Sequence, residues 1–417
     1  MTIVIAGGDL VLPDRILTNA SLIIDGTRIA TIESKSLIDP AGATLVNAAD
    51  CYVVPGFVDV HVHGVEGVDT LDAGSDPVAQ IASRLPRYGV TAFCPTTVAC
   101  PPGDLRRVLE QVSRARVARP PSSARVLPAH LESNFINPEY RGAQPADCLR
   151  LPPNAAYAGR VPGGGNANRT GPAEEFSAAD ILDVIASARP DVGIVTLAPE
   201  LPGGVDLVRS LVASGHRVSL GHTGADIDEA IAAIEAGARH ATHLFNRMTP
   251  MTHRAPGVAG AVLSHEDVAA ELICDGYHVH PAMCRTAIGS KGVDRMMAIT
   301  DGTAGAGLPV RSSSRLGGRR IRVTEKAAVL DDGTLAGSTL TMDRAFKTIV
   351  TKLGLSIVDA SHLCSTTPAR ELGLANFGVI AEGCAADLVV LDRAFRVVHT
   401  FIAGVEVYKS ESGIRNA

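Results

Sequence analysis

The chain has 417 residues, 46% of them apolar, which is enough for a large core and more than a usual single domain. Its 38 basic and 44 acidic residues give a net charge of −6, which excludes the basic surface typical of nucleic-acid-binding proteins. No apolar run reaches the roughly 20 residues of a membrane span, and Met1–Val4 lacks the basic region of a signal peptide. Eight scattered cysteines without a Cys-x-x-Cys pair favour free thiols. We therefore expect a protein of the reducing cytoplasm, with neither nucleic acid nor a membrane as a partner.

Both ends of the chain carry short runs of strand-forming residues, separated by turn residues such as Gly7-Gly8 and Asp25-Gly26. The runs lie at residues 3–5, 20–24, 28–32, 386–391 and 397–402. We expect one small β-sandwich domain assembled from residues 1–54 and 380–417.

Between these ends, in residues 55–379, strand-like runs alternate with helical patterns, which is typical of βα units around a parallel sheet. The strand-like runs lie at residues 52–61, 90–95, 125–131, 192–197, 216–221, 239–243, 268–274 and 295–300. Helical patterns lie at 180–188, 205–213 and 226–236, the last with Asp226 as a capping residue. Eight units predict an α/β fold, a TIM-like (β/α)8 barrel with its active site at the C-terminal strand ends.

His61 and His63 end the first strand-like run. Residues two apart on a strand point to the same side, so both imidazoles project together, a geometry that suits one divalent metal. Alone, His-x-His could equally be a pair of hydrogen-bonded surface histidines.

Four further strand ends carry imidazoles or carboxylates, which makes an accidental arrangement improbable. These residues are Glu132 after His130, His222, His243 and Asp301. All of them fall at the C-terminal ends of predicted parallel strands, so we expect them to converge on one face of one barrel.

Two regions have no place in this scheme. Residues 155–171 are rich in Gly, Asn and Pro and predict a long loop that could act as a lid. Residues 311–337 contain strand-like runs at 320–323 and 328–330 and predict an exposed, solvated hairpin outside the barrel rather than an anion-binding patch.

Motifs along nearly the whole chain resemble the amidohydrolase superfamily and, within it, the N-acetylglucosamine-6-phosphate deacetylase family. They run from PGFVDVHVHG through HLE, GHT and ATHLFNRM to APGVAGA, TDG, GSTLTMDRA, TPARELGL and EGCAADLVVLD. The THLFN-x-M segment with its following arginine and Pro-Gly is the most specific part. The resemblance implies metal-dependent removal of the acetyl group from a phosphorylated amino sugar.

The resemblance also implies roles for individual residues. Glu132, His222 and His243 fall at the family's metal ligands, His61 and His63 would supply a second metal position, and Asp301 matches the general base and acid. One or two divalent metals per subunit are expected, with zinc favoured and iron, manganese or cobalt also compatible.

The sugar phosphate would contact a further set of residues, which are Ala143, Gln144, Asn246, Arg247 through its backbone, Arg254 and His278. In the family the arginine matched by Arg254 reaches in from the neighbouring subunit, which implies a homodimer. Three positions depart from the family pattern: Ser133-Asn134 replace Gly-Pro, Gln144 replaces a frequent histidine, and Arg247 replaces a small residue. These positions are expected near the sugar, so the departures leave the exact substrate open, but they do not include the metal ligands or Asp301.

The absence of lysine from much of the chain narrows the possible subclass of amidohydrolase. The chain has no lysine between Lys35 and Lys291, so a carboxylated lysine on the fourth strand cannot bridge two metals, which disfavours dihydroorotase- or hydantoinase-like chemistry. Deacetylation of N-acetylgalactosamine 6-phosphate or of an N-acyl amino acid stays open as an alternative. A non-catalytic assembly protein on the same scaffold is disfavoured, because every matched ligand and Asp301 are present.

Overall fold

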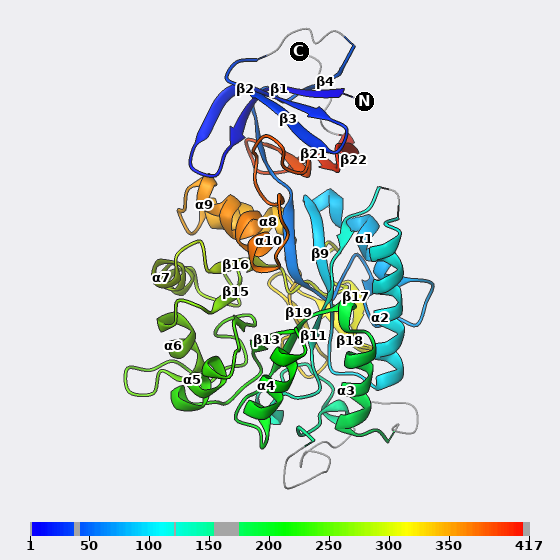
Figure 1. The fold of residues 1–417 in the computed structure, drawn as a ribbon, viewed down its shortest axis with the longest axis vertical. Helices are drawn as coiled ribbons and strands as arrows, with labels where there is room; N and C mark the ends of the chain where they lie inside the picture. The colour runs from blue at the N-terminus through cyan, green and yellow to red at the C-terminus, as the bar shows by residue number, and fades with distance from the viewer. Residues whose placement is uncertain (1, 37–41, 121, 154–174, 412–417) are drawn as a thin grey trace.

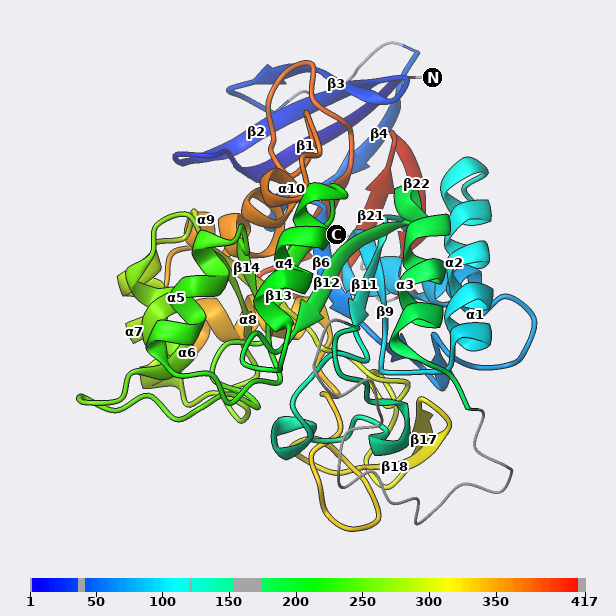
Figure 2. The ribbon, with the colours of Figure 1, turned by 60° about the horizontal axis from the view of Figure 1, so that its bottom comes forward.

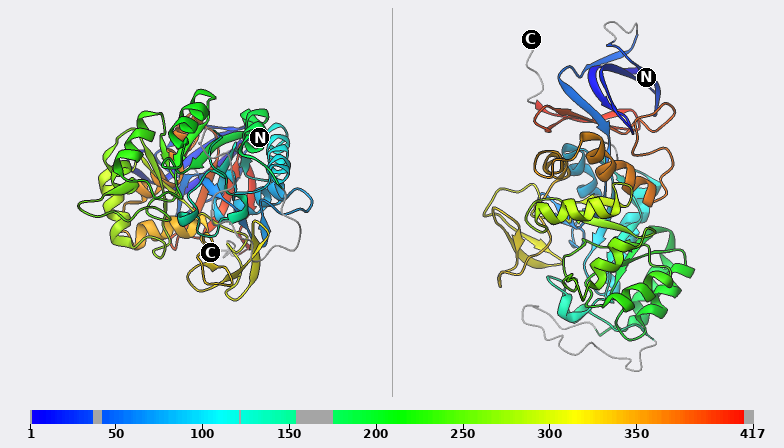
Figure 3. Two further views of the ribbon diagram at one scale, coloured as in Figure 1. Left: turned by 90° about the horizontal axis from the view of Figure 1, so that it is seen from below. Right: turned by 90° about the vertical axis from the view of Figure 1, so that its left-hand side faces the viewer.

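The computed structural model describes residues 2–36, 42–120, 122–153 and 175–411 (Figure 1). A small sheet built from both chain ends lies at one end of a larger α/β barrel (Figures 1 and 3). The long loop predicted at 155–171 lies outside the described residues.

The barrel is a parallel sheet in the order β6-β9-β11-β12-β13-β14-β15-β16, with β10 paired to β9. Its strands are β6 (Phe57–Val62), β9 (Val90–Thr97), β10 (Arg125–Val126), β11 (Ala129–Glu132), β12 (Val192–Leu197), β13 (Arg217–Leu220), β14 (His240–Ala241), β15 (Ala269–Ile273) and β16 (Met296–Ile299). The ring closes where Asp301 N donates to His61 O at 3.0 Å and His63 N donates to Gly302 O at 2.8 Å. The predicted (β/α)8 architecture is confirmed.

Helices surround the barrel (Figure 3, left). They are α1 (Pro77–Arg84), α2 (Pro102–Val117), α3 (Ala178–Ser187), α4 (Gly204–Ala213), α5 (Ile227–Glu235), α6 (Gly257–Ser264), α7 (Pro281–Lys291), α8 (Met342–Thr351), α9 (Ile357–Ser361) and α10 (Thr367–Glu371). Short turns of helix lie at Leu85–Tyr88, Pro138–Tyr140, Ala146–Cys148, Arg189–Asp191 and His362–Thr366. Asp226 caps α5 as predicted, in a capping box with Glu229.

The first predicted strand, 52–61, is two strands in the structure. β5 (Cys51–Pro55) pairs with the terminal sheet, whereas β6 begins the barrel, and Gly56 lies between them. A Cβ at Gly56 would lie 2.2 Å from Thr91 Oγ1, so only glycine permits this close passage from one sheet to the other. The run at 125–131 is likewise divided into β10 and β11.

The terminal sheet joins both ends of the chain in the order β22-β21-β20-β5-β1-β2-β3, with β4 paired to β1. Its strands besides β5 are β1 (Thr2–Val11), β2 (Ile16–Asp25), β3 (Arg28–Glu33), β4 (Thr44–Asn47), β20 (Leu388–Asp392), β21 (Val397–Ile402) and β22 (Val405–Lys409). Ile5 and Leu22 share one apolar core with Leu388 and Phe401. The predicted terminal β domain is confirmed, while its boundaries at 54 and 380 stay a prediction.

A three-stranded sheet of β17 (Ser313–Leu316), β18 (Arg319–Val323) and β19 (Ala328–Val329) projects outside the barrel (Figure 2). The predicted hairpin is present, but it is not fully solvated, because Leu316, Ile321 and Val323 are buried. A two-stranded ribbon of β7 (Gly64–Val65) and β8 (Val68–Asp69) follows β6.

Candidate active site

The C-terminal ends of five barrel strands bring together the six side chains expected to carry the chemistry. His61 lies on β6 and His63 just beyond it, Glu132 ends β11, and three residues follow their strands by two positions: His222, His243 and Asp301. Each of the six residues is at most 6% exposed. The barrel thus gathers imidazoles and carboxylates from distant parts of the chain into one buried cluster.

Glu132, His222 and His243 form the first group. The Nε2 atoms of the two imidazoles lie 3.1 Å apart, and Glu132 Oε1 lies 3.0 Å from His222 Nε2 and 2.9 Å from His243 Nε2. Two imidazole nitrogens at this separation cannot both present lone pairs unless a proton or a cation lies between them. Three ligand atoms of these types, converging from three strands, fit a divalent metal.

His61 and His63 form the second group, which shares Glu132 with the first. Their Nε2 atoms lie 3.2 Å apart, and His63 Nε2 lies 3.4 Å from Glu132 Oε2. Asp301 Oδ1 lies 3.3 Å from His63 Nε2 and 3.4 Å from His61 Nε2. Glu132 therefore faces both groups: its Oε1, which contacts His222 and His243, also lies 3.6 Å from His61 Nε2, and its Oε2 faces His63. The donor set also fits a metal at this second position.

Close charge pairing sets the protonation of the cluster. Burial lowers the pKa of His63, but hydrogen bonds to Asp301 and Glu132 outweigh it and raise the pKa to about 10. His243 is likewise buried, and Glu132 raises its pKa to about 9. Burial raises the pKa of Glu132 itself, yet the neighbouring imidazoles hold it well below its ordinary value. The cluster therefore favours positive charge among its imidazoles and ionised carboxyl groups around them, as expected of a set of residues that binds a cation.

Backbone strain is concentrated at the same strand ends. His222, His243 and Asp301 have φ of 49°, 31° and 49°, in the left-handed region that non-glycine residues rarely adopt. Such residues persist where the surrounding structure over-determines them, and they cluster at functional sites.

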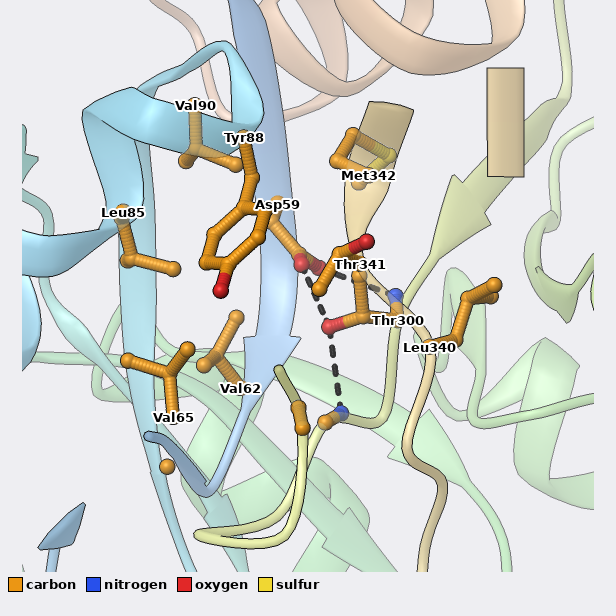
Figure 4. A pocket seen from close by; sticks show the side chains of 13 residues that line it. Asp59, Val62, Val65, Leu85, Tyr88, Val90, Thr300, Leu340, Thr341 and Met342 are labelled. Carbon is orange, nitrogen blue, oxygen red and sulfur yellow. Dashed lines mark hydrogen bonds between the residues drawn. The ribbon is translucent and has the colours of Figure 1, made fainter. Parts of the chain in front are cut away.

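Two buried carboxylates behind the cluster were not anticipated from the sequence. Asp59 Oδ2 accepts a 2.6 Å hydrogen bond from Thr300 Oγ1, beside a cavity of about 10 Å³ that is too small for a sugar (Figure 4). Glu271, on β15, lies 2.9 Å from His61 Nδ1. A charged residue inside an apolar strand pattern is the signal that could have revealed both.

A cavity of about 490 Å³ opens over the cluster, large enough for a phosphorylated sugar. Five of the six residues expected at the substrate line it: Ala143, Gln144, Asn246, Arg247 and His278. The sixth, Arg254, is exposed in the loop before α6 and does not line the cavity of its own chain.

The departures from the family pattern fall into two kinds. Ser133 Oγ donates to Thr196 O at 2.6 Å and Asn134 Nδ2 donates to Cys148 O at 2.7 Å; neither residue lines the cavity. Their expected place near the sugar is therefore corrected, because both side chains bind backbone carbonyls below it. Gln144 does line the cavity, and its Nε2 donates to Glu132 Oε2 while Oε1 accepts from Ala99 N at 2.7 Å.

The fold and the cluster define a metal-dependent hydrolase, and comparison with known proteins gives its class. The amidohydrolase family model matches residues 174–407 of the chain. The chain belongs to the amidohydrolase family, a metal-dependent family, and within it to the N-acetylglucosamine-6-phosphate deacetylases.

Curated relatives and solved structures agree on this placement. The N-acetylglucosamine-6-phosphate deacetylase of Bacillus subtilis is 31% identical over 95% of this chain and 94% of its own length. A variant of the Mycobacterium smegmatis enzyme, solved in complex with N-acetyl-D-glucosamine-6-phosphate, matches with a TM-score of 0.83 at 30% identity, over 97% of this chain and 99% of that chain. The N-acetylgalactosamine-6-phosphate deacetylase of Escherichia coli O157:H7 is 32% identical over 88% of this chain and 90% of its own length.

Proposed function

We propose that this protein is an enzyme that hydrolyses the N-acetyl group of N-acetylglucosamine 6-phosphate, releasing acetate and glucosamine 6-phosphate. The observation that carries the proposal is the convergence of Glu132, His222, His243 and Asp301 at the floor of a sugar-sized cavity. Relatives named for this reaction match nearly the whole chain, and one related structure contains the acetylated substrate.

Metal binding is assigned to the two groups that share Glu132. Glu132, His222 and His243 would hold the metal that the reaction requires, and His61 with His63 would hold a second one. Zinc is favoured by the histidine and carboxylate donors, although iron, manganese or cobalt accept the same set. A bound divalent cation would lower the pKa of its water to about 7 and polarise the acyl oxygen.

Asp301 is assigned the proton transfers. Although burial raises its pKa, His61 and His63 keep the pKa of Asp301 below its ordinary value, so its carboxylate is ionised and can accept a proton. It takes the proton of the attacking water as the carbon–oxygen bond forms. It then returns that proton to the amide nitrogen as the carbon–nitrogen bond breaks, so that the amine leaves neutral.

Substrate recognition is assigned to the cavity wall and to a second subunit. His278, Asn246, Arg247, Ala143 and Gln144 all line the cavity wall. Gln144 also donates a hydrogen bond to the metal-ligand carboxylate of Glu132. Arg254, which faces solvent in its own chain, would reach the phosphate in the neighbouring subunit of a homodimer.

A cytoplasmic location is supported by the cysteines. All eight cysteines are free, and seven are buried, as expected for a protein kept in a reducing compartment. Within the described residues no helix has the length and apolar character needed to span a membrane.

An activity panel with defined metal loading tests the proposal. Acetate release is measured for N-acetylglucosamine and N-acetylgalactosamine, each with and without the 6-phosphate. We expect the highest kcat/KM for N-acetylglucosamine 6-phosphate and loss of activity after chelation. A preference for the galactose isomer would favour the alternative that the Escherichia coli relative represents. Activity that survives complete metal removal would contradict the proposal.

A further inference from the structure

Glu271 is a fully buried carboxylate to which the reaction described above gives no role. It lies in the middle of β15, between apolar neighbours, with an exposed fraction of 0%. A carboxylate buried inside a barrel destabilises the fold unless its oxygens are paired. Its contacts therefore indicate why a charged residue occupies this position.

One oxygen of Glu271 has two partners, and both belong to the metal cluster. Oε2 lies 2.9 Å from His61 Nδ1 and accepts a 3.3 Å hydrogen bond from the backbone nitrogen of His243. The other oxygen, Oε1, has no hydrogen-bond partner in the described part of the chain. The His130 Nδ1 atom lies 3.6 Å from it, but that nitrogen lies 3.0 Å from the carbonyl of Val60.

The contact with His61 determines which of its ring nitrogens faces the other ligands of the cluster. A carboxylate accepts hydrogen bonds, so Nδ1 of His61 carries the proton and Nε2 presents its lone pair. Nε2 is the atom that points toward His63, Glu132 and Asp301. Carboxylates that hold the far nitrogen of a ligating histidine fix its tautomer and orientation and raise its basicity.

Glu271 supports the side chain of a ligand in only one of the two metal groups. Glu271 contacts the ring of His61, which belongs to the second group, but it contacts His243 only at the backbone. We propose that Glu271 is the positioning residue of the second metal position, where it holds His61 in the tautomer and orientation that bind a cation. This inference rests on the proposed two-metal site.

Metal binding to the purified full-length protein tests the inference directly. Cobalt(II) is titrated into metal-free protein, and the visible absorption and the number of metals bound per chain are measured for each variant. Glu271→Leu should weaken the second cobalt by about 10- to 100-fold, the usual cost of losing such a supporting contact, while the first cobalt is retained. Glu271→Gln keeps an acceptor oxygen and should restore part of that affinity.

Asp59→Asn is the matched control, because Asp59 is equally buried and contacts His61 only at its backbone nitrogen, at 3.3 Å. It should leave the second cobalt in place. An equal loss in Asp59→Asn would overturn the inference, since any buried charge would then suffice. Unchanged affinity in Glu271→Leu, or in Glu271→Gln if the leucine variant does not fold, would also overturn it.

The double variant His61→Asn with His63→Asn tests this inference separately from the two-metal site on which it rests. The double variant should bind one cobalt where the unmodified protein binds two, and adding Glu271→Gln to it should change nothing further. Further loss of the remaining cobalt would show a general structural role and overturn the inference. If the unmodified protein binds one cobalt, or the double variant still binds two, the two-metal site itself is wrong and the inference fails with it.

Discussion

His278, at the wall of the cavity, forms a half-buried ion pair with Asp275, with His278 Nδ1 2.6 Å from Asp275 Oδ2. Asp275 Oδ1 also accepts from the backbone nitrogens of Tyr277 and His278, which holds the carboxylate in place. Among the described residues His278 Nε2 has no hydrogen-bond partner, although it is buried beside the cavity. Burial lowers the pKa of His278, but Asp275 outweighs it and raises the pKa, so this histidine stays cationic at higher pH than usual.

The first prediction concerns the pH dependence of phosphate binding. Because the pKa of His278 is raised, its charge is present at low pH and is lost as the pH rises through that pKa. KM for the phosphorylated substrate should therefore rise on the alkaline side. Asp275→Asn removes the cause of the raised pKa, so the same rise should begin at lower pH. The pH profile of KM measures this, and an unshifted profile in Asp275→Asn would contradict it.

The second prediction concerns proton transfer by Asp301. Asp301→Asn preserves the shape of the side chain and should leave the fold and bound metal unchanged. It should lower kcat by about 10²- to 10⁴-fold, the usual contribution of general acid–base catalysis. Steady-state kinetics and metal analysis on the same preparation test this. A variant that stays close to the unmodified enzyme in kcat would assign the proton transfers to another group.

The third prediction concerns the relative importance of the two metal groups. Glu132 faces both of them, so Glu132→Ala should remove bound metal and abolish turnover. The double variant His61→Asn with His63→Asn should lose one metal and keep part of its activity, because Glu132, His222 and His243 stay intact. Elemental analysis beside kcat measures both effects. Full metal content and full turnover in Glu132→Ala would refute the assignment.

The features that could be predicted from the sequence are those that appear as a local pattern of residues along the chain. Eight strand-like runs and the spacing of His61 and His63 are visible along the chain, because strand period and strand ends are local properties. The break at Gly56 between β5 and β6 could not be predicted, because its cause is the close approach of Thr91 from the neighbouring strand. Glu271 was missed for a similar reason, since its partner His61 lies 210 positions away in the chain.

The directions of some side chains near the site also could not be predicted from the sequence. Ser133 and Asn134 differ from the family pattern next to Glu132, and their position suggested a place beside the sugar. In the structure both side chains bind backbone carbonyls instead. Gln144 contacts Glu132 from twelve positions away, across a loop whose path the sequence does not specify.

The fourth prediction concerns Arg254, which the structure leaves outside the cavity of its own chain. A guanidinium offers a planar, permanently charged fork to phosphate oxygens. If Arg254 binds the phosphate, Arg254→Ala should raise KM for the 6-phosphorylated sugar by roughly 10- to 150-fold, and KM for the unphosphorylated sugar far less. Kinetics with both sugars test this, and equal losses on the two would refute the phosphate role.

Mixed dimers test whether Arg254 acts across the subunit interface. Chains carrying Arg254→Ala are combined with chains carrying Asp301→Asn, each of which should be poorly active alone. If the arginine serves the neighbouring subunit, one site of each mixed dimer joins an intact Asp301 to an intact Arg254, and part of the activity should return. If the arginine served its own chain, no site of that kind would form: the Arg254→Ala chain would lack the arginine and the Asp301→Asn chain the aspartate. Verified mixed dimers that show no recovery would therefore place Arg254 outside the partner's active site.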